Sequence, residues 1–203
     1  MRAPRLAGAI LAGGASRRFG RDKAAEEVHG DRLIDRAGFA LRPHCGEVVV
    51  VSSRPDTPAS PWAVIHDSRP PCGPLGGIEA ALQYAGRSGY DAVVVLAVDL
   101  PLVDTTSVGV LVGAFAEDGA RATVAARRGE PDFEPLCAVY PLSCLATVSE
   151  LLDRGEQAAR QLFLTVGGTR VPGVAGAGVN VNEPTDLAKV TCRLRGEATE
   201  VPE

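Results

Sequence analysis

The sequence predicts one α/β domain of three layers, α/β/α, in which helices cover both faces of a mostly parallel, Rossmann-like sheet. Short valine-rich runs alternate with helical segments of about ten to fifteen residues, which is typical of successive βαβ units. The run from Val93 to Val98 contains no polar residue, as expected for a strand that helices cover on both sides. A length of 203 residues with 45% hydrophobic residues suffices for one sizeable core.

The expected elements alternate along the chain from the first apolar run onward. We predict strands at residues 6–11, 48–52, 63–66, 92–98, 122–126 and 136–140. We predict helices at residues 32–44, 75–85, 105–117, 142–152 and 184–190. The glycine-rich stretch 167–178 is expected to be a loop with one short strand. Residues 1–192 are expected to form a single domain, and the polar stretch 193–203 a flexible tail.

The composition excludes several classes of function. A net charge of -4 argues against general nucleic-acid binding, which needs a basic surface. No stretch approaches the roughly 20 apolar residues that span a bilayer, so we expect no contact with membranes and a cytoplasmic protein. The short first apolar run leads into a basic segment rather than a cleavage site, which favours a buried strand over a signal peptide. The five cysteines lack CxxC spacing, so neither a disulfide framework nor a zinc site is predicted.

The stretch from Leu11 to Lys23 reads LAGGASRRFGRDK and directly follows the first expected strand. Ligands of open α/β sheets bind at the carboxyl ends of strands, where glycines let backbone N–H groups approach an anion. The loop is not a Walker A loop, because Gly20 is followed by Arg21 and the lysine comes two positions later. It also lacks the GxGxxG pattern of dinucleotide loops. A solvated surface turn remains the alternative from the residues alone.

Two aspartates follow later strands at the same expected edge of the sheet. Asp99 comes directly after the buried run 93–98, and Asp104 is the better cap for the next helix. We therefore expect Asp99 to be functional rather than a turn or cap residue. Asp67 ends the run 63–66, where a role as a turn residue stays open.

The first loop is similar to the signature loop of the nucleotidyltransferases that resemble the molybdenum cofactor guanylyltransferase. The pattern of that family is roughly L-A-G-G-x-S-x-R-M-G-x-D-K. The sequence departs from it at Phe19, where the family usually has methionine, and both side chains are large and apolar. The matching residues are Leu11, Ala12, Gly13, Gly14, Ser16, Arg18, Gly20, Asp22 and Lys23.

The resemblance implies a sheet of the nucleotide-diphospho-sugar transferase type and a loop that wraps a nucleoside triphosphate. Residues Leu11 to Gly14 then bind the nucleotide, the first three through backbone contacts to base and ribose. Arg18 and Lys23 then meet the phosphates, where cations offset the charge on the α-phosphate and on the leaving pyrophosphate.

The resemblance also extends to both aspartates. The segment AVDLPLV is similar to a C-D-x-P segment of the family, which implies that Asp99 binds the nucleotide and holds magnesium, Mg²⁺ being the implied cofactor. The segment VIHDS resembles one whose aspartate, here Asp67, contacts the nucleoside.

The implied acceptor side has two segments. GPLGGI at 73–78 resembles the family's G-P-L-x-G-I, which places Gly73 and Gly77 near the pterin phosphate at a helix N-terminus. VNVNEPTDL at 179–187 is similar to N-V-N-T-P-E-E-L, with Asn180 and Asn182 on one face of an extended stretch. Plain helix initiation at 73–78, and a cap formed by Asn182 on the helix that starts at Pro184, stay open as alternatives.

The implied reaction moves GMP from GTP to the terminal phosphate of molybdopterin and gives molybdopterin guanine dinucleotide and pyrophosphate. LAGG and the R-D-K ending favour a guanylyltransferase over the similar cytidylyltransferases, which commonly read LAAG. The alternatives are a cytidylyltransferase on molybdopterin, a sugar-1-phosphate nucleotidyltransferase, or a non-catalytic nucleotide-binding partner of a molybdoenzyme. We expect a monomer or weak oligomer with transient contacts to molybdenum cofactor enzymes or chaperones. The residues leave the roles of Glu134 and Arg160 open.

Overall fold

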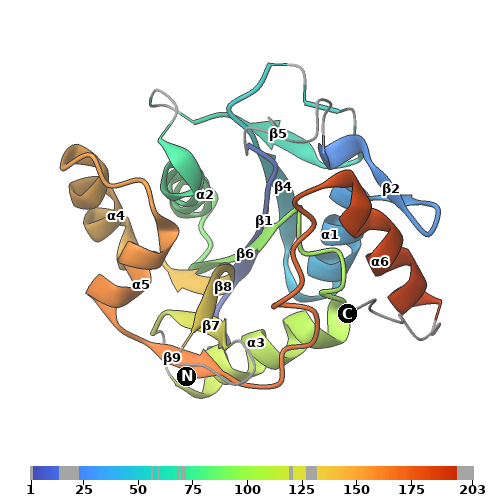
Figure 1. Cartoon of the computed structure of the whole chain (residues 1–203). Helices are drawn as coiled ribbons and strands as arrows, with labels where there is room; N and C mark the ends of the chain where they lie inside the picture. The colour runs from blue at the N-terminus through green and yellow to red at the C-terminus, as the bar shows by residue number, and fades with distance from the viewer. Residues whose placement is uncertain are drawn as a thin grey trace.

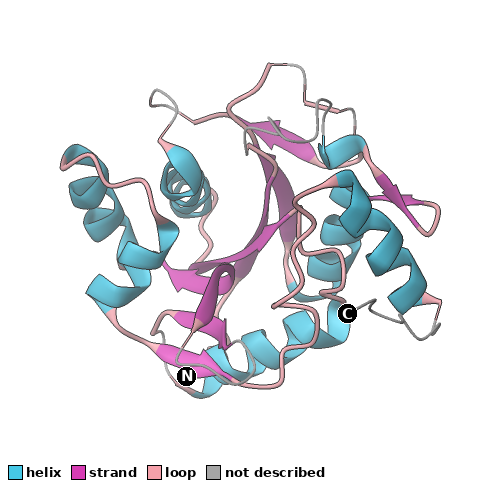
Figure 2. Ribbon diagram, in the orientation of Figure 1, coloured by secondary structure: helices cyan, strands magenta, loops and turns pink. Residues whose placement is uncertain are grey.

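The computed structural model describes residues 2–13, 23–55, 57–58, 60–67, 69, 72–118, 121–126 and 132–195. These residues form a seven-stranded sheet with helices on both faces (Figures 1 and 2). Its strands are β1 (Leu6–Leu11), β4 (Glu47–Val51), β5 (Ala63–Ile65), β6 (Ala92–Ala97), β7 (Thr123–Ala126), β8 (Phe133–Pro141) and β9 (Thr169–Val171). Their order across the sheet is β5-β4-β1-β6-β8-β7-β9.

The two layers of helices cover opposite faces of this sheet. One layer contains α1 (Leu33–Leu41), α3 (Thr105–Glu117) and α6 (Pro184–Leu194). The other contains α2 (Gly73–Arg87), α4 (Cys144–Asp153) and α5 (Ala159–Val166). Side chains of β1 alternate between them, since Ile10 packs with the first layer and Ala9 and Leu11 with the second. The predicted three-layer α/β class is confirmed.

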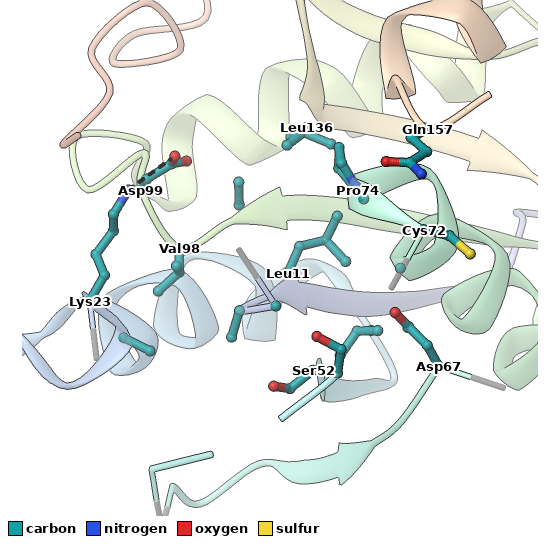
Figure 3. A pocket seen from close by; sticks show the side chains of 18 residues that line it. Leu11, Lys23, Ser52, Asp67, Cys72, Pro74, Val98, Asp99, Leu136 and Gln157 are labelled. Atoms are coloured by element: carbon teal, nitrogen blue, oxygen red, sulfur yellow. Dashed lines mark hydrogen bonds and ion pairs between the residues drawn. The ribbon is translucent and has the colours of Figure 1, made fainter. Parts of the chain in front are cut away.

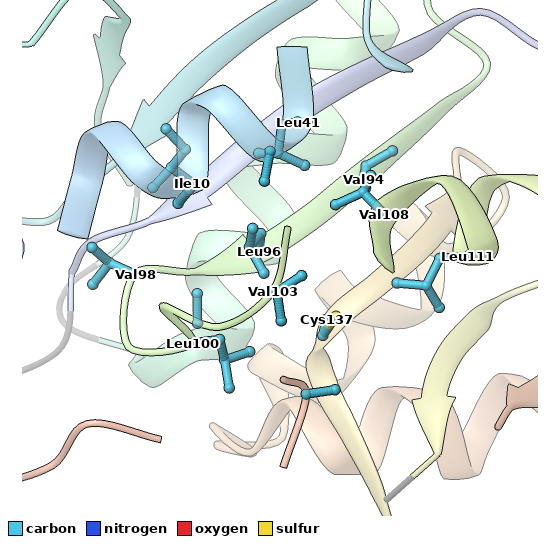
Figure 4. Packing of buried hydrophobic residues seen from close by; sticks show 14 of the residues in the cluster. Ile10, Leu41, Val94, Leu96, Val98, Leu100, Val103, Val108, Leu111 and Cys137 are labelled. Atoms are coloured by element: carbon cyan, nitrogen blue, oxygen red, sulfur yellow. The ribbon is translucent and has the colours of Figure 1, made fainter. Parts of the chain in front are cut away.

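The parallel pairing of the central strands brings their carboxyl ends to one edge. Leu11, the last residue of β1, lies between Val51 of β4 and Ala97 of β6 in the sheet register. The loop that follows β6 is anchored in the core, because Leu100 and Val103 are buried beside Leu96 (Figure 4). Groups at the ends of these strands are therefore held close together on a rigid base.

The structure differs from the prediction in the second half of the sheet. Strand β8 runs antiparallel between β6 and β7. Ala126 and Phe133 are too close in sequence for the helical crossover that parallel strands require, so β7 and β8 pair antiparallel. All other neighbouring pairs in this sheet are parallel, so the sheet is still mostly parallel.

Several elements were not predicted. The helix α5 buries Leu162 and Phe163, and the short hairpin β2 (Glu27–Val28) and β3 (Asp31–Arg32) turns at His29 and Gly30. Both turn residues have positive φ angles, 56° and 88°, as a two-residue type I′ turn requires. The remaining short elements are the 3-10 helices η1 (Lys23–Ala25) and η2 (Arg42–His44).

The C-terminal helix is longer than predicted. It continues to Leu194, past the expected end at residue 190 and into the stretch expected to be a tail, of which residues 196–203 lie outside the described part. Within the described ranges, no helix has the length and apolar character needed to cross a membrane.

Candidate active site

A cavity of about 430 Å³ opens at the carboxyl edge of β1, β4 and β6 (Figure 3). Its lining combines an apolar base from the strand ends with charged groups from the loops that follow them. The lining residues are Leu11, Ala12, Gly13, Lys23, Ala24, Val51, Ser52, Ser53, Asp67, Cys72, Gly73, Pro74, Gly77, Ala97, Val98, Asp99, Leu136 and Gln157.

An ion pair between Lys23 and Asp99 lies at one side of this cavity (Figure 3). The Nζ of Lys23 is 3.5 Å from Oδ2 of Asp99, and the two side chains are only 15% and 24% exposed. The other carboxylate oxygen, Oδ1 of Asp99, is buried and has no hydrogen-bond partner among the described residues. A buried oxygen without a partner is costly in the free protein and is therefore a ready acceptor or metal ligand.

The backbone around Asp99 continues from the sheet in a tight turn. The N–H of Val98 donates to the Leu11 carbonyl at 3.2 Å, and the N–H of Leu100 donates to Ala97 at 3.2 Å. Asp104 caps α3 as predicted, because its carboxylate accepts the N–H of Ser107 at 2.8 Å. Asp99 therefore points into the cavity without serving as this cap.

Asp67 lies elsewhere along the wall, just after β5. Its Oδ1 is buried and lacks a hydrogen-bond partner in the part of the chain that the structure describes. Burial raises the pKa of Asp67, the negative charge of Glu79 raises it further, and His66 partly opposes both. This end of the cavity thus disfavours additional negative charge.

Glu79 is buried behind the cavity wall, and several polar partners compensate the burial of its carboxylate. The Arg69 guanidinium donates to both of its carboxylate oxygens, at 2.9 and 3.1 Å, and the Ser149 hydroxyl donates at 2.6 Å. Arg69 also contacts Asp153 at 2.6 Å. Because two carboxylates occupy Arg69, it leaves Asp67 beside a net negative cluster.

The N-terminus of α2 forms a further part of the wall. Gly73 has a positive φ of 63°, and a Cβ there would lie 3.0 Å from the carbonyl oxygen of Gln157. A Cβ at Gly77 would lie 3.3 Å from a methyl group of Leu11. Both glycines let α2 approach its neighbours closely, and both also line the cavity.

The structure brings most of the predicted site together. Those that line the cavity are Leu11, Ala12, Gly13, Lys23, Asp67, Gly73, Gly77 and Asp99. Gly14 and Arg18 lie outside the described residues.

The two asparagines are not in the cavity lining. Val181, which lies between them, donates its N–H to the Asp99 carbonyl at 2.9 Å. Glu183 caps α6 in a capping box with Asp186, so the alternative that Asn182 forms this cap is wrong. The acceptor role of Asn180 and Asn182 stays a prediction.

Sequence reasoning missed Cys72, Gln157 and the pair Ser52–Ser53. The serines follow β4 at the same sheet edge, so the rule that found Asp99 could have found them. Cys72 is the N-cap residue of α2, directly before the predicted segment 73–78, whereas Gln157 reaches the cavity by tertiary packing, for which the sequence holds no local signal. Of the residues left open, Arg160 pairs with Asp132 and stacks over the Phe133 ring at 4.4 Å, and Glu134 is buried.

The donor set at Asp99 fits a hard cation. No group of three or more His, Cys, Asp or Glu side chains that could hold a metal ion gathers within the described ranges. One carboxylate with a buried oxygen that has no hydrogen-bond partner among the described residues suits Mg²⁺, which often takes one or two carboxylates and completes its shell with water and substrate phosphates.

Comparisons with known proteins agree with this architecture. Residues 8–169 match the family model described as MobA-like NTP transferase domain. A probable molybdenum cofactor guanylyltransferase from Opitutus terrae is 41% identical over 158 residues, which cover 77% of this chain and 76% of that protein. A molybdenum cofactor guanylyltransferase from Cereibacter sphaeroides is 31% identical over 201 residues, with 96% and 100% coverage.

A solved structure shares the fold. The molybdopterin-guanine dinucleotide biosynthesis protein A from Archaeoglobus fulgidus superposes with a TM-score of 0.76 at 21% identity, covering 94% of this chain and 99% of that one. A mostly parallel sheet with a cavity at the ends of its central strands is common to many α/β enzymes, and the family match assigns this chain to the nucleotidyltransferases among them. More narrowly, the chain belongs to the family of MobA-like NTP transferases, as the first loop predicted.

Proposed function

We propose that the chain transfers GMP from GTP to the terminal phosphate of molybdopterin. An oxygen of that phosphate forms a bond to the α-phosphorus of GTP, the bond from this phosphorus to the oxygen bridging to the β-phosphate breaks, and pyrophosphate leaves. The observation that carries the proposal is the Lys23–Asp99 pair at the cavity edge, in a chain whose curated relatives are named guanylyltransferases.

Charge neutralisation and positioning are the main tasks of the site, because a phosphate acceptor is already ionised at neutral pH and needs no strong base. Lys23 offsets negative charge on the reacting phosphates, and its low exposure of 15% limits screening by solvent. Arg18 serves the same phosphates in this proposal.

Magnesium is the proposed cofactor, and Asp99 is the residue that would hold it. When bound, the ion would add positive charge next to the phosphates and would stabilise the negative charge of the leaving pyrophosphate. Asp99 would then have both carboxylate oxygens engaged, one toward the ion and one toward Lys23.

The nucleoside occupies the Asp67 end in this proposal, with Leu11, Ala12 and Gly13 against base and ribose. A carboxylate accepts hydrogen bonds from guanine N1 and N2 or from ribose hydroxyls. Cytosine offers only its N4 amine, so Asp67 favours GTP over CTP. The acceptor approaches from the side of Gly73 and Gly77 in this proposal, since both glycines line the same cavity.

The test compares GTP, CTP, UTP and ATP, each with Mg²⁺, in thermal unfolding and in pyrophosphate release with molybdopterin. A ligand at 100 times its Kd stabilises a folded protein by about 2.7 kcal/mol, so selective binding gives a clear shift in Tm. We expect GTP to give the largest shift and the only molybdopterin-dependent release. Equal or greater release with CTP indicates a cytidylyltransferase, and GTP binding without turnover of molybdopterin indicates a non-catalytic nucleotide-binding protein.

A further inference from the structure

The segment 174–181, called the crossing segment below, joins β9 to α6 and runs past the loop that carries Asp99 (Figure 1). It lies beyond the residues 8–169 that match the family model. The Val181 N–H donates to the backbone carbonyl of Asp99 at 2.9 Å. A segment remote in sequence therefore fixes the backbone of the residue at the centre of the site.

Burial anchors the crossing segment beside the same loop. Ala177 and Val181 are 1% and 0% exposed, and they belong to the core cluster that also contains Leu100 and Val103. The segment and the Asp99 loop thus share one hydrophobic core, so a shift of one requires the other to adjust.

Gly176 sets how closely the two backbones approach. A Cβ at this position would lie 2.3 Å from the carbonyl carbon of Leu102 and 2.6 Å from the backbone nitrogen of Val103. These are backbone atoms that cannot rotate away, so any side chain here must displace the crossing segment or the loop. The φ of +79° at Gly176 also disfavours other residues.

Helix α1 also contacts the loop that carries Asp99. The Nε of Arg36 donates to the Pro101 carbonyl at 3.3 Å, and its guanidinium also pairs with Asp31. The loop is therefore held both from α1 and from the crossing segment.

We infer that the crossing segment positions Asp99 for catalysis, with Gly176 and Val181 as the positioning residues. The inference rests on the proposed nucleotidyl transfer, in which Asp99 must meet the metal and phosphates in one geometry. Asp67, at the nucleoside end, follows β5, which β4 and β1 separate from β6 in the sheet, so we expect the segment to affect turnover more than the binding of nucleotide.

The first test replaces Gly176 by alanine and uses Gly173→Ala as its matched control. Both glycines have a φ of +79°, but a Cβ at Gly173 meets nothing within 4 Å. The two variants therefore carry the same backbone penalty and differ in the clash with Leu102. We expect Gly176→Ala to lower kcat about 100-fold, because small misplacements of catalytic groups have effects of that size, with an unchanged Kd for GTP without divalent ion. Gly173→Ala should keep kcat.

A second pair separates positioning from plain stability, and it decides the matter if Gly176→Ala fails to fold. Val181 and Val190 are similarly buried valines of the same cluster, but only the Val181 side chain anchors a backbone N–H that donates to Asp99. Alanine keeps this N–H and removes the packing that holds it in place. Val181→Ala and Val190→Ala should lower Tm by similar amounts, whereas only Val181→Ala should lower kcat, by roughly tenfold. An equal loss of kcat in both variants would overturn the inference.

Hydrogen exchange gives a readout that needs no turnover. The Val181 amide should be protected in the native chain and in Gly173→Ala, and should lose protection in Gly176→Ala. It should stay protected in Asp99→Ala, which keeps the accepting carbonyl but loses transfer. If Gly176→Ala keeps both this protection and kcat while the native chain is active, the positioning role is wrong. A native chain that protects the amide but transfers no nucleotide would instead overturn the proposed function, and the catalytic role of the segment with it.

Discussion

Asp99 and Asp67 line the same cavity, and each has one buried carboxylate oxygen without a hydrogen-bond partner among the described residues. Their surroundings are opposite in sign. Asp99 faces the Lys23 ammonium at 3.5 Å, whereas Asp67 lies near Glu79 and has a raised pKa. Figure 3 shows the Lys23–Asp99 pair at one side of the cavity and Asp67 near Cys72 at the other.

The difference suits the two sides of the cavity to different parts of one nucleotide. The Lys23–Asp99 side provides a cation and a carboxylate that can share a metal, which suits phosphates. The Asp67 side disfavours more negative charge and offers an acceptor oxygen with no partner among the described residues, which suits the N–H or O–H donors of a nucleoside. The same residue type thus recognises two different parts of one nucleotide, and its neighbours decide which.

The largest expected effect comes from removing the charge at Asp99. Asp99→Asn should lower nucleotidyl transfer by about 100-fold or more, because an amide neither balances Lys23 nor provides an anionic ligand. Pyrophosphate release with GTP, Mg²⁺ and molybdopterin measures this.

Asp104→Asn is the matched control for that prediction, since it removes the same charge five residues later. Asparagine caps helices about as well as aspartate, so Tm and transfer should both persist. Full activity of Asp99→Asn would show that the charge of Asp99 is not needed for transfer, and would contradict the assignment of the phosphates to the Lys23–Asp99 side.

The second prediction concerns GTP binding at the Asp67 side of the cavity. Asp67→Asn should weaken GTP binding about 10- to 100-fold, the range expected for losing hydrogen bonds to a charged acceptor. Titration with GTP in the absence of divalent ion isolates this end from Asp99. Asp104→Asn, which removes a carboxylate outside the cavity, should leave GTP affinity unchanged.

The same variant should respond to pH in a defined way. The folded-state pKa of Asp67 is raised, so its contribution to stability is present below the ordinary carboxyl pKa and is lost as the pH rises through the raised value. Asp67→Asn lacks that loss. Its Tm should therefore match or exceed that of the native chain at pH 7, and the gain should shrink toward acid pH. A Tm deficit that is constant across pH would contradict the raised pKa.

How much the sequence predicts differs between these regions for physical reasons. Strand β1 and helix α3 have the predicted bounds, because continuous apolar runs and the Asp104 cap are local signals. Asp99 and Asp67 were found by their place after strands, since parallel strands end at one edge. The antiparallel β8, Gln157 and the contact of Val181 with Asp99 depend on how distant segments pack, which no local pattern encodes.

The smallest effect concerns Cys72, which lines the cavity near Asp67. Burial raises the pKa of the Cys45 thiol to about 12 and that of Cys144 to about 11, and burial together with the charge of Glu134 raises that of Cys137 to about 12. Because the thiolate is the reactive form, these three should react slowly with iodoacetamide at pH 8.

Cys72 and Cys192, which are both partly exposed, should then carry most of the label, whereas Cys45 is also partly exposed but has the raised pKa given above. If the nucleoside fills the Asp67 side, GTP should slow labelling of Cys72 and leave Cys192, on the outer helix α6, unaffected. Peptide mass spectrometry with and without GTP measures both sites in one sample. Asp67→Asn at the same GTP concentration should restore labelling of Cys72, whereas Asp99→Asn without divalent ion should not. Equal protection of Cys72 in both variants would mean that the nucleotide does not distinguish the two aspartates.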